Sequence, residues 1–226
     1  MRKQQLLYAG IVGPLLFVAV FLVEGATRPG YSAWRNYVSQ LATGDGGWVQ
    51  VANFLVCGSL VLVFAIGLRG AIAGSRGSVG GPLLLALFAL ALLVAGVFVT
   101  DPALGYPPGA AQVHTAHGMI HGLAGLAAFT SLPAAGFVMA WHFAGESGSG
   151  GWAIYSALVG AAIIVLFIAF TTTSTMDATG ALPNAPTGLL QRIAIITGWT
   201  WIAMVALHLL RARGGTSDRD VVRLAQ

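Results

Sequence analysis

Charged residues are scarce in this sequence: they make up 8% of its 226 residues, whereas hydrophobic residues make up 57%. A water-soluble domain normally carries about 25% charged residues to cover its surface. The deficit excludes an ordinary soluble domain and indicates that lipid is the main solvent of this chain. The mean hydropathy of +0.81 supports the same conclusion.

Cysteine is almost absent as well, because Cys57 is the single one and lies inside an apolar run. One cysteine excludes an intrachain disulfide, a CxxC zinc site and a cysteine-held iron–sulfur cluster. A contiguous basic face is also missing, although the formal net charge is +4. The basic residues stand at the ends of apolar runs, which is typical of membrane topology, so we expect no nucleic-acid partner.

Long apolar segments are what the sequence has in abundance. Six of them are long enough to cross a hydrocarbon core of about 30 Å at a helical rise of about 1.5 Å per residue. The predicted fold class is therefore all-α, a bundle of six transmembrane helices that forms a single domain over 1–226. The predicted spans are 6–24, 48–69, 82–99, 112–142, 152–171 and 188–210.

The connections between these spans are short except at 25–47. Four large side chains recur there at helical spacing: Tyr31, Trp34, Val38 and Leu41. This spacing predicts a short amphipathic helix that lies in the membrane interface. The loop that contains it is expected on the extracytoplasmic side.

That orientation follows from Lys and Arg, which are enriched in cytoplasmic loops. With the N-terminus inside, the outer side holds only Arg28, Arg35 and Arg192. The inner side then holds Arg2, Lys3, Arg69, Arg76, Arg211, Arg213, Arg219 and Arg223. We therefore predict that both termini are cytoplasmic, including a polar tail at 212–226.

Polar side chains concentrate at the outer ends of the predicted spans, whereas the middle of the bundle is almost wholly apolar. An ionisable group at membrane depth costs on the order of 2.5–3.5 kcal/mol, so such groups normally face the protein interior and pair. The outer third of the bundle is therefore predicted to contain a polar pocket. Its candidates are Glu24, Ser39, Asn53, Asp101, His114, His117, His121, Asp177, Gln191 and Arg192.

Three of these candidates, His114, His117 and His121, follow one another at spacings of three and four residues. On a helix with about 100° per residue, this places the imidazoles within an arc of about 60°. They could supply two or three zinc ligands, with Asp101 a short loop away as a fourth. The alternative is that hydrogen bonds inside the bundle satisfy each imidazole. The lack of an HExxH or CxxC pattern favours this alternative.

Gly118 and Gly122 form a GxxxG motif beside these histidines. Small residues at this spacing allow a neighbouring helix to approach closely. We therefore expect helix packing there rather than a ligand role.

Arg192 lies about one turn inside the sixth span. It either extends toward the outer headgroups, or binds an anionic headgroup or a carboxylate such as Asp101, Glu24 or Asp177. Asp177 itself is expected in a solvated turn close to Pro183.

The remaining polar candidates give weaker signals. Asn53 either binds a substrate or only bonds a neighbouring helix. Ser39 is a nucleophile only if a base lies beside it. His142 and His208, near the inner ends of two spans, could in principle ligate a haem, but interfacial histidines are common and we expect no haem.

Five different short motifs are distributed along nearly the whole chain. They are Ser39-Gln-Leu-Ala-Thr-Gly, Asn53-Phe54 after Trp48, Phe98-Val-Thr-Asp101-Pro102, His117-Gly118 with His121, and Gly188-Leu-Leu-Gln-Arg192 with Trp199. In order and spacing they resemble the bacterial membrane-protein family named domain of unknown function 998. The resemblance implies a fold and a bacterial inner-membrane location, not a reaction. His114 is not part of the family pattern, which favours a His117–His121 pair over a three-histidine site.

A more distant similarity connects Ser39, Asp101, His117 and His121 with the alkaline ceramidases and the progestin/adipoQ-type receptors. Those proteins place a Ser, an Asp and several His around a zinc ion inside a helical bundle. They generally have seven helices and a late histidine pair, which this sequence lacks. The similarity is therefore an analogy only.

The sequence leads to one main functional hypothesis: an intramembrane hydrolase of a lipid-like substrate, dependent on zinc, with a pocket on the outer side. Asp101, His117, His121 and Ser39 would be catalytic, and the metal ligands would come from His117, His121, His114 and Asp101. Arg192 and Asn53 would bind the substrate. Two alternatives stay open: a non-catalytic lipid-binding, sensory or accessory protein, and a small transporter, which the apolar inner half disfavours.

Overall fold

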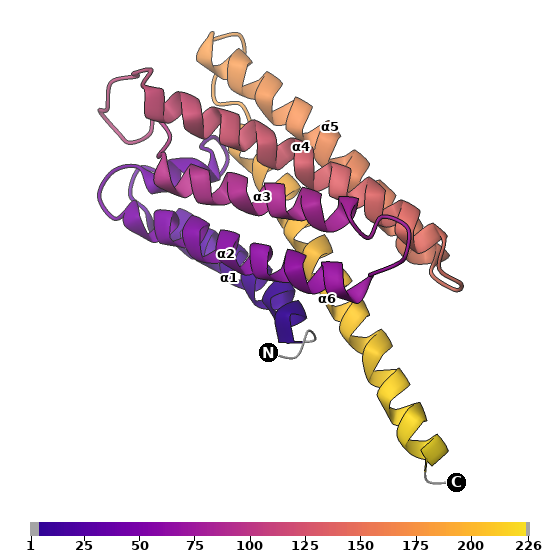
Figure 1. Cartoon of the computed structure of the whole chain (residues 1–226). Coiled ribbons are helices and arrows are strands. Elements are labelled where there is room, and N and C mark those ends of the chain that lie inside the picture. Colours follow the sequence, from indigo (N-terminus) through magenta and orange to yellow (C-terminus); the bar gives the residue numbers. More distant parts are fainter. Residues whose placement is uncertain (1–4, 225–226) are drawn as a thin grey trace.

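Six long helices run up and down in the computed structural model, which describes residues 5–224 and, from 213 onward, the backbone alone (Figure 1). They are α1 (Ala9–Thr27), α2 (Trp48–Ala71), α3 (Gly80–Val97), α4 (Ala116–Ala144), α5 (Gly150–Ala178) and α6 (Thr187–Leu224). A short 3-10 helix, η1 (Gln5–Tyr8), precedes α1. Each of the six is long and apolar enough to cross a membrane, which confirms the predicted all-α, six-helix membrane fold.

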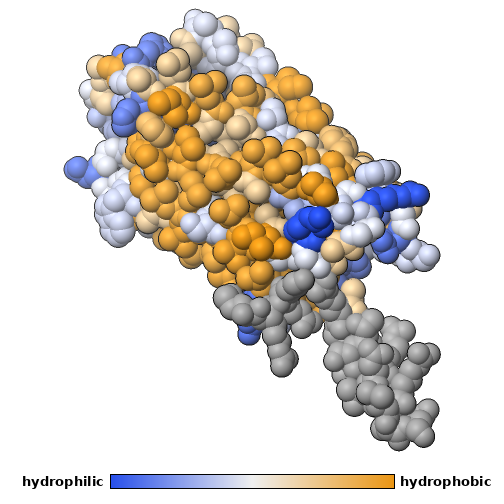
Figure 2. Space-filling model, in the orientation of Figure 1, coloured by the Kyte–Doolittle hydropathy of each residue, from blue (hydrophilic) through white to orange (hydrophobic). Residues whose placement is uncertain are grey.

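The helices form a closed ring, because each packs against the next and α6 returns to pack against α1. The interior of the ring is filled by large side chains such as Phe17, Phe64 and Trp201, which are at most 2% exposed. Phe17 stacks on Trp199 with ring centroids 4.3 Å apart. Apolar side chains also cover much of the outside of the bundle, as Figure 2 shows. An apolar exterior is what a lipid environment allows.

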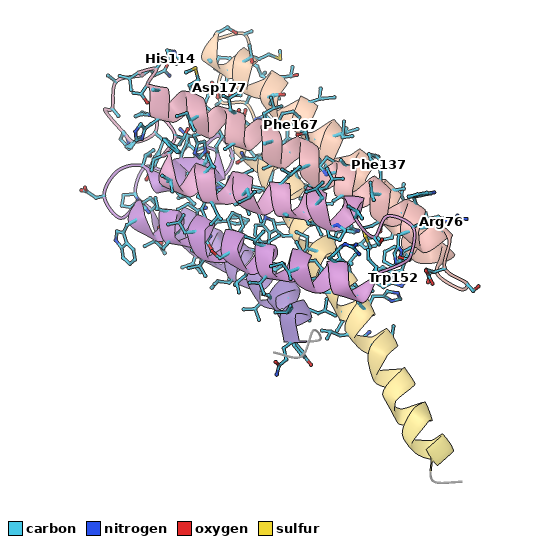
Figure 3. All side chains as sticks on the ribbon, in the orientation of Figure 1. Arg76, His114, Phe137, Trp152, Phe167 and Asp177 are labelled. Carbon is cyan, nitrogen blue, oxygen red and sulfur yellow. The ribbon has the colours of Figure 1, made fainter. Side chains whose placement is uncertain are left out.

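The two ends of the bundle differ, and we name them by what lies there. At the capped end, three loops meet: the first loop (28–47), the loop at 98–115 and the loop at 179–186. At the terminal end, η1 begins, α6 extends beyond the bundle, and the segments 72–79 and 145–149 connect the helices. In Figure 3, His114 and Asp177 lie toward the capped end, and Arg76 and Trp152 lie toward the terminal end.

Several boundaries differ from those predicted. Helix α4 begins at Ala116 rather than at 112, because the Thr115 hydroxyl accepts the N–H of Gly118 at 3.0 Å and caps the helix. Helix α5 continues to Ala178, so Asp177 lies on a helix and not in a solvated turn. The backbone of α6 stays helical to Leu224, into the predicted tail. Arg2 and Lys3, on which the predicted orientation partly rests, lie outside the described residues, and the orientation stays a prediction.

The first loop also differs from its prediction, since its one helical element is a five-residue 3-10 helix, η2 (Val38–Ala42). Val38 and Leu41 are at most 1% exposed, so they face the protein rather than the membrane interface. The loop folds across the end of the bundle instead of lying beside it. Burial of these two side chains is the physical reason for the difference.

Candidate functional site

A cavity of about 80 Å³ lies inside the ring beneath the capped end. Its wall is mostly apolar and rich in aromatic side chains. The aromatic members are Phe17, Phe54, Phe88, Phe129 and Trp199. Three polar side chains also line it: Ser39 from η2, His121 from α4 and Gln191 from α6. An apolar cavity with a few convergent polar groups is the usual form of a small-molecule site.

His121 is the one ionisable side chain among the residues that line the cavity. It is 7% exposed, and its Nδ1 lies 2.8 Å from the carbonyl oxygen of Phe98 and 3.1 Å from that of Ala95. A carbonyl oxygen can only accept, so Nδ1 carries the hydrogen and donates it. When the imidazole is neutral, Nε2 is then its basic nitrogen. The end of α3 therefore fixes both the orientation and the tautomer of His121.

Ser39 reaches the cavity because η2 is tied to helix α6. The side-chain oxygen of Gln191 accepts the backbone N–H of Val38 at 2.8 Å. This bond orients the Gln191 amide and leaves its NH₂ group as the donor end. Gln40 supports η2 from the other side by accepting the N–H of Tyr37 at 2.9 Å and donating to the carbonyl of Ala103. Side chains from η2, α4 and α6 thus meet at one cavity.

Arg192 does not line this cavity, and its partners are backbone carbonyls rather than the carboxylates that the sequence suggested. It is 6% exposed and donates to Ala33, Asn36 and Gly188 at 2.6–3.0 Å. It also donates to the hydroxyl of Tyr31, whose pKa burial raises to about 12. The guanidinium fastens the first loop over the end of α6. Arg192 therefore positions the cap and does not contact the cavity.

Gly188 makes this arrangement possible. A Cβ at this position would lie 2.3 Å from the carbonyl oxygen of Asn36 and 2.9 Å from a nitrogen of Arg192. Real Cβ atoms do not approach other atoms so closely, so the cap requires glycine at this point of α6.

Two of the predicted pocket carboxylates are engaged in fastening the cap. Asp177 accepts two bonds from Arg35, at 2.7 and 2.9 Å, and its side chain is 1% exposed. Hydrogen bonding to Asp177 raises the pKa of Arg35 further. Glu24 pairs with Arg28 at 2.5 Å, and Arg28 also donates to backbone carbonyls of the first loop. These bidentate and bridging contacts hold the loop and do not face the cavity.

Asp101 acts at the start of α4. Its carboxylate accepts the N–H of Thr115 at 2.8 Å and the hydroxyl of Thr115 at 2.6 Å, and these hydrogen bonds lower the pKa of Asp101. A Cβ on Gly118 would lie 2.0 Å from an Asp101 oxygen, so Gly118 makes room for the carboxylate. Gly122 has no atom within 4 Å of its ideal Cβ position. The GxxxG motif therefore accommodates Asp101 rather than a neighbouring helix.

The three histidines do not form the predicted stripe. Because α4 begins at Ala116, His114 lies before the helix, and both His114 and His117 are exposed. The His117 ring packs against Phe98 at 5.2 Å, while His121 faces the cavity. Among the side chains that the structure describes, those of residues 5–212, no group of three His, Cys, Asp or Glu could hold a metal ion. The structure does not bring His114, His117, His121 and Asp101 together into a metal site.

Asn53 packs helices together rather than lining the cavity. Its side-chain nitrogen donates to the carbonyl of Phe17 on α1 and to Gln50, both at 3.2 Å, and its oxygen accepts from Cys57 at 3.3 Å. Gln191 is the polar cavity residue that the sequence placed among the pocket candidates without a specific catalytic or binding role. The sequence feature that could have marked Gln191 as a site residue is its position as a polar side chain inside an apolar span, directly before Arg192.

A closed ring of six apolar helices around a buried cavity defines a multi-pass α-helical membrane protein. Residues 11–208 match the family described as "Protein of unknown function (DUF998)", and the chain belongs to this family. The match runs from α1 into α6, and it confirms the resemblance carried by the short motifs. No curated protein and no solved structure matches the chain.

Proposed function

We propose that the protein binds the hydrocarbon part of a lipid-like molecule in the cavity and hydrolyses an ester or amide bond held against Ser39 and His121. The observation that carries this proposal is that Ser39, His121 and Gln191 meet at one aromatic-lined cavity within the membrane-spanning helices. Aromatic and aliphatic walls favour a hydrocarbon chain. A hydroxyl, a neutral imidazole and an amide donor are the groups that acyl transfer requires.

In this mechanism, the Ser39 hydroxyl attacks the carbonyl carbon of the substrate and passes its proton to Nε2 of His121. The Gln191 NH₂ group donates to the oxyanion of the tetrahedral intermediate. The intermediate collapses to acyl-Ser39, and the leaving alcohol or amine takes the proton from His121. Water then attacks acyl-Ser39 by the same route and releases the acid. The carbonyls of Phe98 and Ala95, which hold the His121 Nδ1–H, take the orienting role that a carboxylate has in serine hydrolases.

We place the capped end on the extracytoplasmic side of a bacterial inner membrane. This orientation is supported by Arg69, Arg76 and Arg211 at the terminal end, because cytoplasmic loops are enriched in basic residues. The basic residues of the capped end are engaged in fastening the first loop, as Arg35 and Arg192 show.

The test uses the purified protein in lipid vesicles with a fluorogenic long-chain ester and a lipophilic fluorophosphonate probe, which reacts with an activated serine. We expect Ser39→Ala and His121→Gln to lower turnover by about 100-fold or more, the usual contribution of a nucleophile or base. Probe labelling should disappear in Ser39→Ala. The matched control is Ser59→Ala, because Ser59 is exposed on α2 and donates only to the Leu55 carbonyl.

The second candidate is a non-catalytic lipid-binding protein. It is favoured by the number of polar side chains near the cavity that only hold the cap, such as Asp177 and Arg192. In that case the same lipid would co-purify with wild type and Ser39→Ala, and the wild type would neither turn over the ester nor take up the probe. A small transporter is less well supported, because Val61, Phe64 and Leu68 fill the core toward the terminal end and are fully buried.

A further inference from the structure

A groove of about 650 Å³ runs along the outside of the bundle between α3 and α4, which lie side by side in Figure 1. Leu87 and Leu90 of α3 and Leu123 of α4 line it and are 46–62% exposed. Both helices are membrane-spanning segments, so hydrocarbon is what this surface meets in a bilayer. The groove is therefore shaped and placed for an acyl chain.

The few polar groups of the groove are already satisfied. Thr130 donates to the carbonyl of Leu126 at 2.8 Å, and Ser131 donates to that of Ala128 at 3.5 Å. Hydroxyls that bond their own helix offer little to a polar ligand. The groove consequently suits a hydrocarbon chain better than a headgroup.

The groove and the internal cavity share part of their walls. Ala91 of α3 and Ala124 of α4 line both of them, and each is 6% exposed. These two alanines therefore form part of the wall between the lipid-facing groove and the cavity. Next to them, Gly125 lines the cavity, and no atom beyond its own helix and chain neighbours lies within 4 Å of its ideal Cβ position.

The capped end offers no comparable path. The first loop is fastened there by Arg192 and by the Arg35–Asp177 pair, and its residues Val38 and Leu41 are buried. A substrate that came from water would have to displace this network of hydrogen bonds. A path between α3 and α4 would break none of the hydrogen bonds that fasten the first loop.

We propose that the α3–α4 groove binds one acyl chain of a membrane lipid and that this chain reaches the cavity laterally, between Ala91 and Ala124. This inference rests on the proposed function and narrows its substrate class to long-chain lipids that are delivered from the bilayer. Water-soluble short-chain esters lack the chain that the groove would hold.

The test is photolabelling of the protein in phosphatidylcholine vesicles with a phospholipid that carries a diazirine in its acyl chain. In the wild type, label should appear on the groove residue Leu123 and on the interior residues Phe17 and Trp199. The last two are 2% exposed, so label on them reports occupancy of the cavity. In the double variant Ala91→Leu, Ala124→Leu, interior labelling should fall about tenfold or more while groove labelling persists.

Ala127→Leu is the matched control, because Ala127 lines the groove but not the cavity. It should leave interior labelling unchanged. Ala124→Val, a smaller change, should give an intermediate loss if the double variant does not fold, with thermal unfolding in detergent as the check on folding.

The outcomes separate the two proposals. Undiminished interior labelling in folded Ala91 and Ala124 variants would overturn the lateral path and leave the proposed function standing. Absence of interior labelling in the wild type, with the groove labelled, would overturn both. Loss of interior labelling in the Ala127 control would show that the effect is not specific to the shared wall and would overturn the path.

Discussion

The two ends of the bundle contain similar polar side chains but use them differently. At the capped end, Arg192 donates to a backbone carbonyl of the first loop, and Asn36 and Gln40 of that loop donate to the carbonyls of Leu104 and Ala103 in the loop at 98–115. These bonds close the bundle above the cavity. At the terminal end, the connections are short, and a pocket of about 330 Å³ stays between the helices. His142 lines it and lies 3.0 Å from the Ser75 hydroxyl and 3.1 Å from the Arg76 carbonyl. The difference is that the first loop is long enough to fold back over the capped end, whereas the short connections at the terminal end leave this pocket uncovered.

Removal of Arg192 should have the largest effect on this difference between the two ends, because Arg192 fastens the first loop at the capped end. Arg192→Ala removes the charged group that donates to the carbonyls of Ala33, Asn36 and Gly188. We expect the free energy of unfolding to fall by about 3 kcal/mol, in line with the cost of losing hydrogen bonds to a charged group. Thermal or denaturant unfolding in detergent measures it.

Arg69→Ala is the control at the opposite end, since Arg69 is exposed on the last turn of α2. Its unfolding free energy should change by no more than about 0.5 kcal/mol. Equal effects of the two substitutions would mean that Arg192 does not hold the cap.

Substitutions at two glycines, one on α6 against the first loop and one on the surface of α4, should change the free energy of unfolding by smaller and different amounts. Gly188→Ala places a methyl group against the Asn36 carbonyl and should destabilise the protein by about 2 kcal/mol. Gly122→Ala meets no atom within 4 Å and replaces glycine inside a helix, so it should be neutral or stabilising by up to about 1 kcal/mol. The same unfolding measurement compares them, and a Gly188→Ala protein as stable as Gly122→Ala would contradict the tight contact.

The smallest expected effect depends on pH and is confined to the start of α4. Asp101 has a pKa below its ordinary value because Thr115 donates to its carboxylate, so the carboxylate contributes stability that is fully present above about pH 4. That contribution is lost as the pH falls through the lowered pKa of the folded state. Amide hydrogen exchange at Thr115 and Gly118 should therefore become faster, relative to a peptide standard, only under acidic conditions. In Asp101→Asn it should show no such pH dependence.

Much of the fold could be predicted from composition, because a chain so poor in charge must place its long apolar segments in lipid. The arrangement of the candidate site could not. The histidine stripe depended on a helix beginning at 112, whereas Asp101 binds Thr115 across the loop at 98–115 and the helix begins only after Thr115. The conformation of that loop, which makes this contact, is not marked by a sequence pattern. Three of the partners of Arg192 are backbone carbonyls, which every residue has, so no sequence pattern marks them. The cavity itself arises from packing around His121 and Ser39 and has no sequence signature.

The attachment of η2 to the last helix has a consequence for how the protein is made. Ser39 is synthesised early, but the side chains that hold its loop in place, Gln191 and Arg192, are 153 and 159 residues away from their partners Val38 and Ala33. The ribosome must therefore deliver the chain as far as α6 to the insertion machinery before the cap can close. A nascent chain arrested before α6 would carry Ser39 on an unfastened loop, so the site becomes complete only after α6 has been inserted.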